Sequence, residues 1–452
     1  MKHIIAILIL VFNINFLQAF DLEVDILNNN YNPIPILIAD FVTDKPSKDY
    51  YKVLKNNILY DLEQSGVFYP RFIKEDKLQF NNNFKLDEID FSEYGYYPTT
   101  LVGSILYDEI KAIYIIKFML IDNYTKEIKT SYGYDIKSIN IEEDIVKISH
   151  DIANEVYKSI LGIEGYFNTS LVYVGDNKLM LSDYSGRNKK ELLSTQGKIL
   201  GPVFSHNNRY VAYVDFINGH STIYLYDFYF DKKIKIADFL GLSLSPRFSR
   251  KDKTLLFSIA YDGATNIFEL NLANKKTKKL SNNYFINLPG GYSYDEEYII
   301  FNSDRSGTPN IYVMTKDGKN VKRISKGEGS YYNPSFAPNN NIILFTKIVG
   351  GQFYIGVMTL DGKEKIITKD PFTESPSWFL DGRHVIYQYS YDVDQKNRLY
   401  SFYILDIISG HKQAIKPAIN AFNPTTSNGF ILNKKLRSKY AINNISENEV
   451  LQ

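Results

Sequence analysis

The chain has 452 residues, 52 of them basic and 51 acidic, and this near balance of charge argues against an electrostatic nucleic-acid binder. It contains no cysteine, which excludes disulfide bonds, zinc–thiolate sites and thiol chemistry. Aromatic residues, mostly Tyr and Phe, make up 15% of the chain, a share that suits a sheet-rich fold.

The first residues have the pattern of a secretory signal peptide. A positive start at Lys2 precedes a continuous apolar run over 4–12, and Ala19 offers a small residue for cleavage before Phe20. An uncleaved membrane anchor is the alternative, although the run is short for a membrane span. We expect a signal peptide over 1–19, cleaved near Ala19, and a mature protein without stable membrane insertion.

The segment that follows strictly alternates apolar and acidic residues. As a strand it would place the apolar side chains on one face and three carboxylates on the other. It is either the first strand of the next domain or a tethered strand that adds to the sheet edge of a partner, in a binding and tether segment over 20–33. The residues of the strand are Phe20, Asp21, Leu22, Glu23, Val24, Asp25 and Ile26.

Residues 34–163 are expected to form a compact α/β domain. A buried strand over 34–41 precedes a helix over 49–65, which Gly66 ends. A second helix is expected over 141–161, where isoleucines recur at helical spacing. Between the helices we expect a strand over 67–69, a polar, Asn-rich loop over 75–97, and strands over 100–106, 112–122 and 127–136.

The chain beyond this domain repeats with a period near 44 residues. Tyr213, Phe257, Phe301 and Phe345 follow one another at steps of 44. Motifs of the type Pro-x-Phe-Ser, such as the one that begins at Pro246, recur at steps of 42 to 48 residues. A period in the low forties with four short strands per unit is typical of β-propeller blades. Helical repeats would need longer amphipathic stretches than these units contain.

Counting strands predicts how the ring closes. Five complete units begin at prolines, three strands over 171–194 lack a first strand, and a lone first strand lies around 421–424. We expect this C-terminal strand to complete the N-terminal blade, which gives six four-stranded blades over 164–429 and no free sheet edge. Residues 430–452 are interpreted as a flexible basic and polar tail.

Several local motifs carry a family resemblance. Asp61-Leu-Glu-Gln-Ser-Gly66 lies at a helix end, Gly162-Ile-Glu-Gly165 lies at the domain junction, and Ile311-Tyr-Val-Met314 belongs to the repeat. With the order of the parts up to about Gly429, these motifs resemble the TolB family of the periplasmic Tol–Pal system. Two departures are an eroded Ser-Pro-Asp-Gly turn, here Ser205-His-Asn-Asn208, and the extra basic tail.

The resemblance implies a non-enzymatic periplasmic scaffold that maintains the outer membrane and its constriction at cell division. It implies binding of the Pal lipoprotein through the propeller and of the TolA C-terminal domain through the strand at 20–26, with other outer-membrane or peptidoglycan-associated proteins as further partners. Segments that lead into the first strands converge at one mouth of the channel, so we expect the Pal site there. Its expected contact residues are Leu242, Ser243, Leu244, Phe285, Tyr331, Tyr332, Glu374 and Phe422.

The alternative function is a propeller-containing periplasmic peptidase or a sugar- or ligand-binding protein. A linked hydrolase needs a Gly-x-Ser-x-Gly turn, and the nearest approaches, at 241–245 and 291–295, lack the second glycine. The six histidines are scattered without metal-ligand spacing. We therefore expect no catalysis and no cofactor and name no metal ligand, while a metal held by loop carbonyls and carboxylates in the channel stays open.

Overall fold

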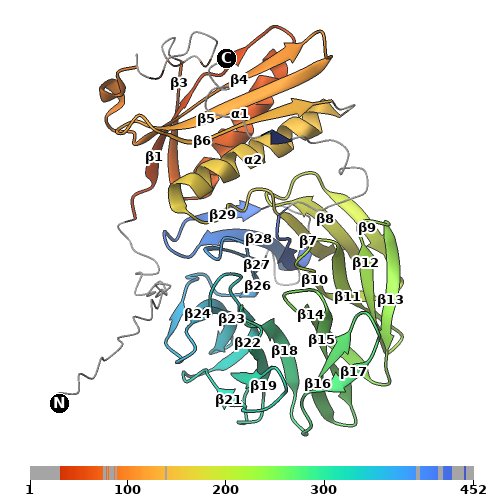
Figure 1. The fold of residues 1–452 in the computed structure, drawn as a ribbon. Coiled ribbons are helices and arrows are strands. Elements are labelled where there is room, and N and C mark those ends of the chain that lie inside the picture. The colour runs from red at the N-terminus through yellow and green to blue at the C-terminus, as the bar shows by residue number, and fades with distance from the viewer. Residues whose placement is uncertain are drawn as a thin grey trace, which may run out of the picture.

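An α/β domain lies against one side of a β-propeller whose sheets are arranged radially around a channel (Figure 1). The structure, a computed structural model, describes residues 31–74, 89–137, 140–392, 398–415, 421–429 and 442–443, together with Leu78, Phe80 and Leu86. The expected signal peptide, the strand at 20–26 and most of the expected tail lie outside the described residues. Among the residues described, no helix has the length and apolar character needed to span a membrane.

The α/β domain is a mixed sheet with two helices on one face. The strand order is β3-β1-β4-β5-β6, with β1 parallel to β3 and β4, the short β2 parallel to β4, and the β4–β5 and β5–β6 pairs antiparallel. Both helices bury one apolar stripe, such as Leu54 and Ile58 of the first and Ile148 and Ile152 of the second, against this sheet. The elements are β1 Ile34–Ala39, β2 Val42–Thr43, α1 Lys48–Gln64, β3 Phe68–Ile73, β4 Thr99–Asp108, β5 Ile113–Asp122, β6 Ile128–Ile136 and α2 Ile141–Leu161.

The second face of the sheet is covered by the segment that we expected to be a polar loop. Leu78, Phe80 and Phe91 are buried there against Val102 and Met119 of the sheet. The segment includes a short 3-10 helix, η3, over Phe91–Tyr94. The apolar residues of this part of the sequence are irregularly spaced among asparagines. The sequence therefore had no periodic pattern from which burial of both faces of the sheet could be predicted.

The propeller has six four-stranded antiparallel sheets, as predicted. The four aromatic residues that recur at steps of 44, such as Phe257 and Phe301, are fully buried, each in the second strand of its blade. Five blades are β10 Lys198–Phe204, β11 Tyr210–Ile217, β12 His220–Asp227 and β13 Lys232–Asp238; β14 Leu242–Phe248, β15 Thr254–Tyr261, β16 Ala264–Asn271 and β17 Thr277–Lys279; β18 Asn287–Tyr292, β19 Tyr298–Ser303, β20 Asn310–Thr315 and β21 Lys322–Arg323; β22 Ser330–Phe336, β23 Ile343–Val349, β24 Gln352–Met358 and β25 Glu364–Ile366; β26 Thr373–Trp378, β27 His384–Asp392, β28 Arg398–Asp406 and β29 Lys412–Ile415.

The sixth blade combines strands from both ends of the propeller, which confirms the predicted closure. Its order is β30-β7-β8-β9, formed by Ala421–Thr426, Ser170–Gly175, Lys178–Asp183 and Lys190–Ser194. The Ser427 backbone N–H donates to the Ser170 carbonyl at 2.9 Å, and the Ser170 N–H donates to the Ser427 hydroxyl at 2.8 Å. Asn428 then exchanges hydrogen bonds with Asn208 of the next blade, at 2.7 and 3.0 Å.

The C-terminal segment returns to the α/β domain. Ile442 and Asn443 form the short strand β31, which adds antiparallel to the edge of the sheet beside Gly133 and Tyr134 of β6. We expected a flexible tail in this part of the chain, and the repeat pattern gave no sign of this pairing. The remaining residues of that tail lie outside the described part of the chain.

Truncation of the chain after residue 415 is expected to lower the melting temperature by about 10 °C or more. It removes β30 and opens the ring, and each kcal/mol lost shifts the melting temperature of a domain of this size by about 2–4 °C. Truncation after Gly429 keeps β30 and the hydrogen bonds of Ser427 and Asn428. It should leave the propeller's melting temperature within about 2 °C of the full chain. Calorimetry of both truncations makes the comparison, and equal melting of the two would contradict the shared blade.

Candidate functional site

The propeller presents two faces of different construction. The distal face consists of the loops that lead into the inner strands and the turns between second and third strands. The proximal face consists of the connections from first to second and from third to fourth strands, and it contacts the α/β domain. The distal face is therefore the one that the α/β domain leaves uncovered.

A β-bulge in each inner strand sets the level at which the channel begins. The pairing register shifts once in β10, β14, β18, β22, β26 and β30. In five of the six the bulge contains a residue with a φ of +48° to +53° directly before a proline, and these residues are Gly201, Ser245, Asn333, Ser375 and Asn423. Bulges of this kind bend a strand and re-aim its side chains. The same five residues mark one end of the cavity inside the ring.

The predicted Pal-contact residues all lie on the distal side of the inner strands, but they differ in accessibility. The side chain of Phe285 is 42% exposed. Leu242, Leu244, Tyr332, Glu374 and Phe422 are half-buried at the rim.

Ser243 and Tyr331 are fully buried inside their blades, so neither side chain is accessible to a partner. The Tyr331 ring packs against Phe345, tilted by 51° with the ring centroids 5.4 Å apart, and its hydroxyl donates to the Glu364 carboxylate at 2.7 Å. The sequence could not separate them from their neighbours, because alternate residues of an inner strand face channel and blade by turns.

The distal face carries further apolar residues that the sequence analysis did not select. Leu240 and Tyr284 are 83% and 87% exposed, in the loops that lead into β14 and β18. Other exposed apolar side chains follow on neighbouring loops and turns of this face, at Ile217, Tyr261, Ile286 and Val349. The sequence could have indicated these residues, because each is a large apolar residue placed in or next to a polar turn. The proximal connections expose fewer, at Phe230, Tyr294, Tyr298 and Val321. The larger gathering on the distal face is typical of a protein-interaction surface.

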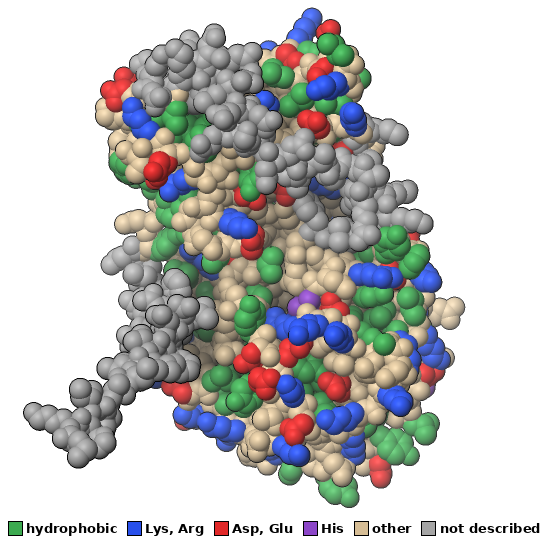
Figure 2. Space-filling view, in the orientation of Figure 1, with side chains coloured by type: hydrophobic (Ala, Val, Ile, Leu, Met, Phe, Trp, Pro, Cys, Tyr) green, Lys and Arg blue, Asp and Glu red, His purple; other side chains and the backbone are tan. Residues whose placement is uncertain are grey.

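The surface charges are mixed. Figure 2 shows Lys and Arg side chains interspersed with Asp and Glu over the visible face of the propeller, with no large field of one sign. The described residues also contain no group of three or more His, Asp or Glu side chains arranged to hold a metal ion.

The α/β domain is joined to the propeller through buried polar groups as well as apolar ones. Asp61 of α1 accepts a hydrogen bond from the Tyr184 hydroxyl of the propeller at 2.5 Å, and its other oxygen lies 2.6 Å from Nδ1 of His150 of α2. All three side chains are buried. His150 is one of the six scattered histidines of the sequence, and its spacing gave no sign of this contact with Asp61.

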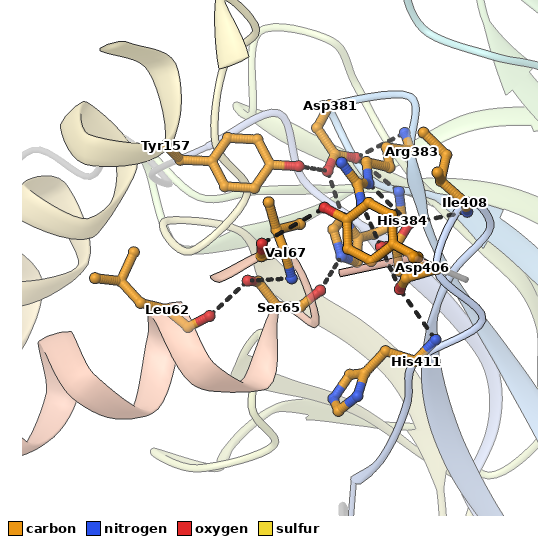
Figure 3. Close-up of polar contacts among 12 residues, drawn as sticks. Leu62, Ser65, Val67, Tyr157, Asp381, Arg383, His384, Asp406, Ile408 and His411 are labelled. Carbon is orange, nitrogen blue, oxygen red and sulfur yellow. Dashed lines mark hydrogen bonds and ion pairs between the residues drawn. The ribbon is translucent and has the colours of Figure 1, made fainter. Parts of the chain in front are cut away.

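A second buried cluster lies beside the first (Figure 3). His384, at the start of β27, has Nδ1 at 2.5 Å from the Asp381 carboxylate and Nε2 at 2.9 Å from the carbonyl of Ser65, at the end of α1. The Tyr157 hydroxyl of α2 donates to Asp381 at 3.1 Å. Because both ring nitrogens of His384 face acceptors, the geometry suits the doubly protonated imidazolium.

The edge of this cluster is held by a two-pronged ion pair and a close backbone approach. The Arg383 guanidinium donates to both oxygens of Asp406, at 2.8 and 2.5 Å. Gly66, with a φ of +68°, lies so close to His411 that a Cβ atom there would come within 2.3 Å of that side chain. The glycine that ends α1 is thus needed for the docking of the two domains.

Comparison with known families decides the identity of the repeat. The sequence matches the family described as the TolB beta propeller domain over residues 157–415. The chain belongs to the TolB beta propeller domain family.

Curated relatives of this TolB-family chain carry the name Tol-Pal system protein TolB. The protein of Wigglesworthia glossinidia brevipalpis is 30% identical over 241 residues, which are 50% of this chain and 54% of that protein. The protein of Bordetella pertussis is 26% identical over 228 residues, 48% of each chain. The chain thus spans about half the length of the curated relatives it matches.

A solved structure extends the likeness in fold to the α/β domain. The crystal structure of TolB from Acinetobacter baumannii superposes with a TM-score of 0.73, covering 88% of this chain and 97% of that one. The two sequences are 22% identical, so this likeness concerns the fold alone. It agrees with the predicted architecture of a small α/β domain followed by a six-bladed propeller.

The junction of this TolB-family chain contains groups with shifted pKa values. Burial opposes the charge of His384, but the Asp381 carboxylate outweighs it and raises the pKa of the imidazole. His150 follows the same pattern, with burial outweighed by Asp61 and a raised pKa. Burial raises the pKa of Asp151 to about 7, and it lowers the pKa of His411. A histidine with a raised folded pKa stabilises the fold below its unfolded pKa and loses that contribution as the pH rises through the folded value.

The free energy of unfolding is therefore expected to fall as the pH rises from 6 to 9, by about 1.4 kcal/mol for each unit by which a histidine pKa is raised. The lowered pKa of Asp381 changes the free energy of unfolding only near and below the ordinary value of about 3.8, which lies outside the range of pH 6 to 9. Urea unfolding of His384→Gln should show a weaker pH dependence than the unchanged chain. His220→Gln, at an exposed histidine paired with Asp238, is the matched control and should keep the full dependence. Equal pH dependence of the His384 variant and the unchanged chain would contradict this assignment.

Proposed function

We propose that this protein is a periplasmic scaffold of the Tol–Pal system, secreted through its N-terminal segment and without catalytic activity. In this role the propeller binds the Pal lipoprotein, the strand at 20–26 binds the TolA C-terminal domain, and the assembly maintains the outer membrane and its constriction at division. Family membership supports the role, and the name of the curated relatives supports the system to which it is assigned.

The observation that carries the proposal is the apolar distal face. Large side chains there stand exposed on the side of the propeller that the α/β domain leaves open, with Leu240, Tyr284 and Phe285 among them. Apolar and aromatic anchors supply most of the binding energy of protein interfaces. The proposed Pal site therefore consists of Leu242, Leu244, Phe285, Tyr332, Glu374 and Phe422, with the exposed residues of the neighbouring loops around them.

Mixed surface charge fits a protein partner better than a polyanion. Nucleic-acid binding needs a basic stripe or patch, and acidic and basic side chains alternate over the visible face of the propeller (Figure 2). A protein docked on the apolar rim would instead be oriented by the surrounding charges.

The double variant Phe285→Ala with Tyr332→Ala is expected to weaken binding of the purified soluble Pal domain at least about ten-fold, since each truncated anchor costs about 1 kcal/mol or more. Titration calorimetry measures the affinity, and melting curves check that the variant folds.

Phe230→Ala with Tyr298→Ala removes the same two side-chain types from the proximal face, where both are exposed. This matched control should bind Pal with unchanged affinity. A loss of affinity in the control alone would place the Pal site on the proximal face. Unchanged affinity in both variants would show that neither pair of residues belongs to the Pal site.

Deletion of residues 20–26 is expected to abolish binding of the TolA C-terminal domain without changing the melting temperature of the propeller. The backbone of the strand would supply the hydrogen bonds, while Leu22, Val24 and Ile26 would fill alternate pockets of the partner. Leu22→Asp with Val24→Asp should have the same effect. Replacement of the three acidic residues by Asn should instead slow association and flatten its salt dependence. Native affinity of the deletion variant for TolA would show that this segment is only a first strand.

A further inference from the structure

The channel of the propeller encloses a cavity whose charged lining has one sign. The cavity has a volume of about 280 Å³ and extends from the bulges of the inner strands to the proximal loops. Arg247 and Arg250 line it, together with His206. None of the described residues that line it is Asp or Glu. A cavity with this lining concentrates positive potential in a space large enough for a small molecule.

Arg247 lies in β14, two residues after the bulge at Ser245. One nitrogen, Nη1, donates to the carbonyl of Pro246 at 2.8 Å. A guanidinium has five N–H donors, and no described carboxylate forms an ion pair with this one. Burial without a counter-charge lowers the pKa of Arg247 to about 10. The remaining donors of this side chain are available to a ligand in the cavity.

Arg250 extends across the proximal end of the same cavity. Its Nη2 donates to the carbonyl of Ala337, two blades away, at 3.0 Å. Asp252 and Glu296 are the carboxylates beside this end of the cavity. Asp252 accepts from the N–H groups of His206 and Asn207 at 2.8 Å each and faces Nδ1 of His206 at 3.3 Å, and Glu296 accepts from the N–H of Lys251 at 3.3 Å. The histidine of the lining is thus paired, whereas the two arginines line the cavity without an ion pair to a described carboxylate.

A polar side chain of the opposite wall is also without a partner. The hydroxyl oxygen of Ser335, in β22, is buried and makes no hydrogen bond to the described residues. Its carbonyl accepts from the Trp378 indole at 3.4 Å, so the residue is held in place while its buried hydroxyl has no partner among the described residues. Buried polar atoms are normally hydrogen-bonded, and an unpaired one that lines a cavity points to a missing ligand or water. Pro202, Pro334 and Pro376 supply apolar walls beside it.

We propose that the channel binds a small organic anion whose carboxylate or phosphate head is paired with Arg247 and hydrogen-bonded by the Ser335 hydroxyl. Planar guanidinium groups bind both kinds of oxyanion through two parallel hydrogen bonds. Arg250 adds a second positive charge at the proximal end, and the proline walls accommodate an apolar body. The volume of the cavity selects a small molecule rather than a polymer. This site is separate from the distal face and does not depend on the proposed docking of Pal.

Titration calorimetry of the full mature chain with succinate, with inorganic phosphate and with neutral succinamide tests the site. We expect saturable binding of succinate or of phosphate and none of succinamide. Binding of succinate alone identifies a carboxylate head, and binding of phosphate alone identifies a phosphate head. Absence of saturable binding by both anions, or equal binding of succinamide, would overturn the proposal.

Two variants assign the binding to the cavity. Arg247→Gln should lower the affinity for the bound anion at least ten-fold, whereas Arg323→Gln, at an exposed arginine of β21, should leave it unchanged. Ser335→Ala removes only the unpaired hydroxyl, so it should fold normally and weaken binding several-fold. It keeps the test decisive if the Arg247 variant does not fold. Undiminished affinity in Ser335→Ala and in a folded Arg247→Gln would contradict the assignment, and Pal binding would be unaffected by that outcome.

Discussion

The pairing of β30 with β7 is the interaction on which the rest of the structure depends. Ala421 lies opposite Gly175 and Phe422 opposite Val174, so two segments almost 250 residues apart in the chain share one blade. Propeller sheets contact only their neighbours around the ring, and an unpaired β7 would leave a free edge and an open channel. The cavity, the rim of the distal face and the surface that receives the α/β domain all require that the ring is closed.

The junction between the domains adds a second constraint, which fixes orientation. Apolar packing alone is tolerant of small rotations, but Asp61 and His384 each need a partner at hydrogen-bond distance on the other domain. Breaking such a buried pair leaves an uncompensated charge, which costs several kcal/mol. The α/β domain is therefore held on the proximal side, close to the blades formed by β26–β29 and by β30 with β7–β9 (Figure 1). That arrangement leaves the distal face open.

The sequence was sufficient to predict the features that depend on local or periodic patterns of residues. Recurrence of Tyr213 and Phe257 at a fixed step indicated the blades, because each fills the same wedge between neighbouring sheets. Contacts between distant residues were beyond this reasoning. His384 and Ser65 are 319 positions apart, and each alone looks like an ordinary polar residue. The burial of Tyr331 was also missed. The bulge that re-aims this inner strand depends on the positive φ of Asn333, which an asparagine permits but which its presence in a sequence does not predict.

The proximal side of the propeller holds the α/β domain, and we propose that the distal side docks the lipoprotein. Hydrogen–deuterium exchange of the mature chain, with and without a saturating amount of the soluble Pal domain, tests this division most directly. We expect slower exchange in residues 239–244, 283–288 and 330–333, and unchanged exchange in the proximal loops at 206–209 and 250–253. Slower exchange confined to the proximal loops, or no change anywhere at saturation, would contradict it.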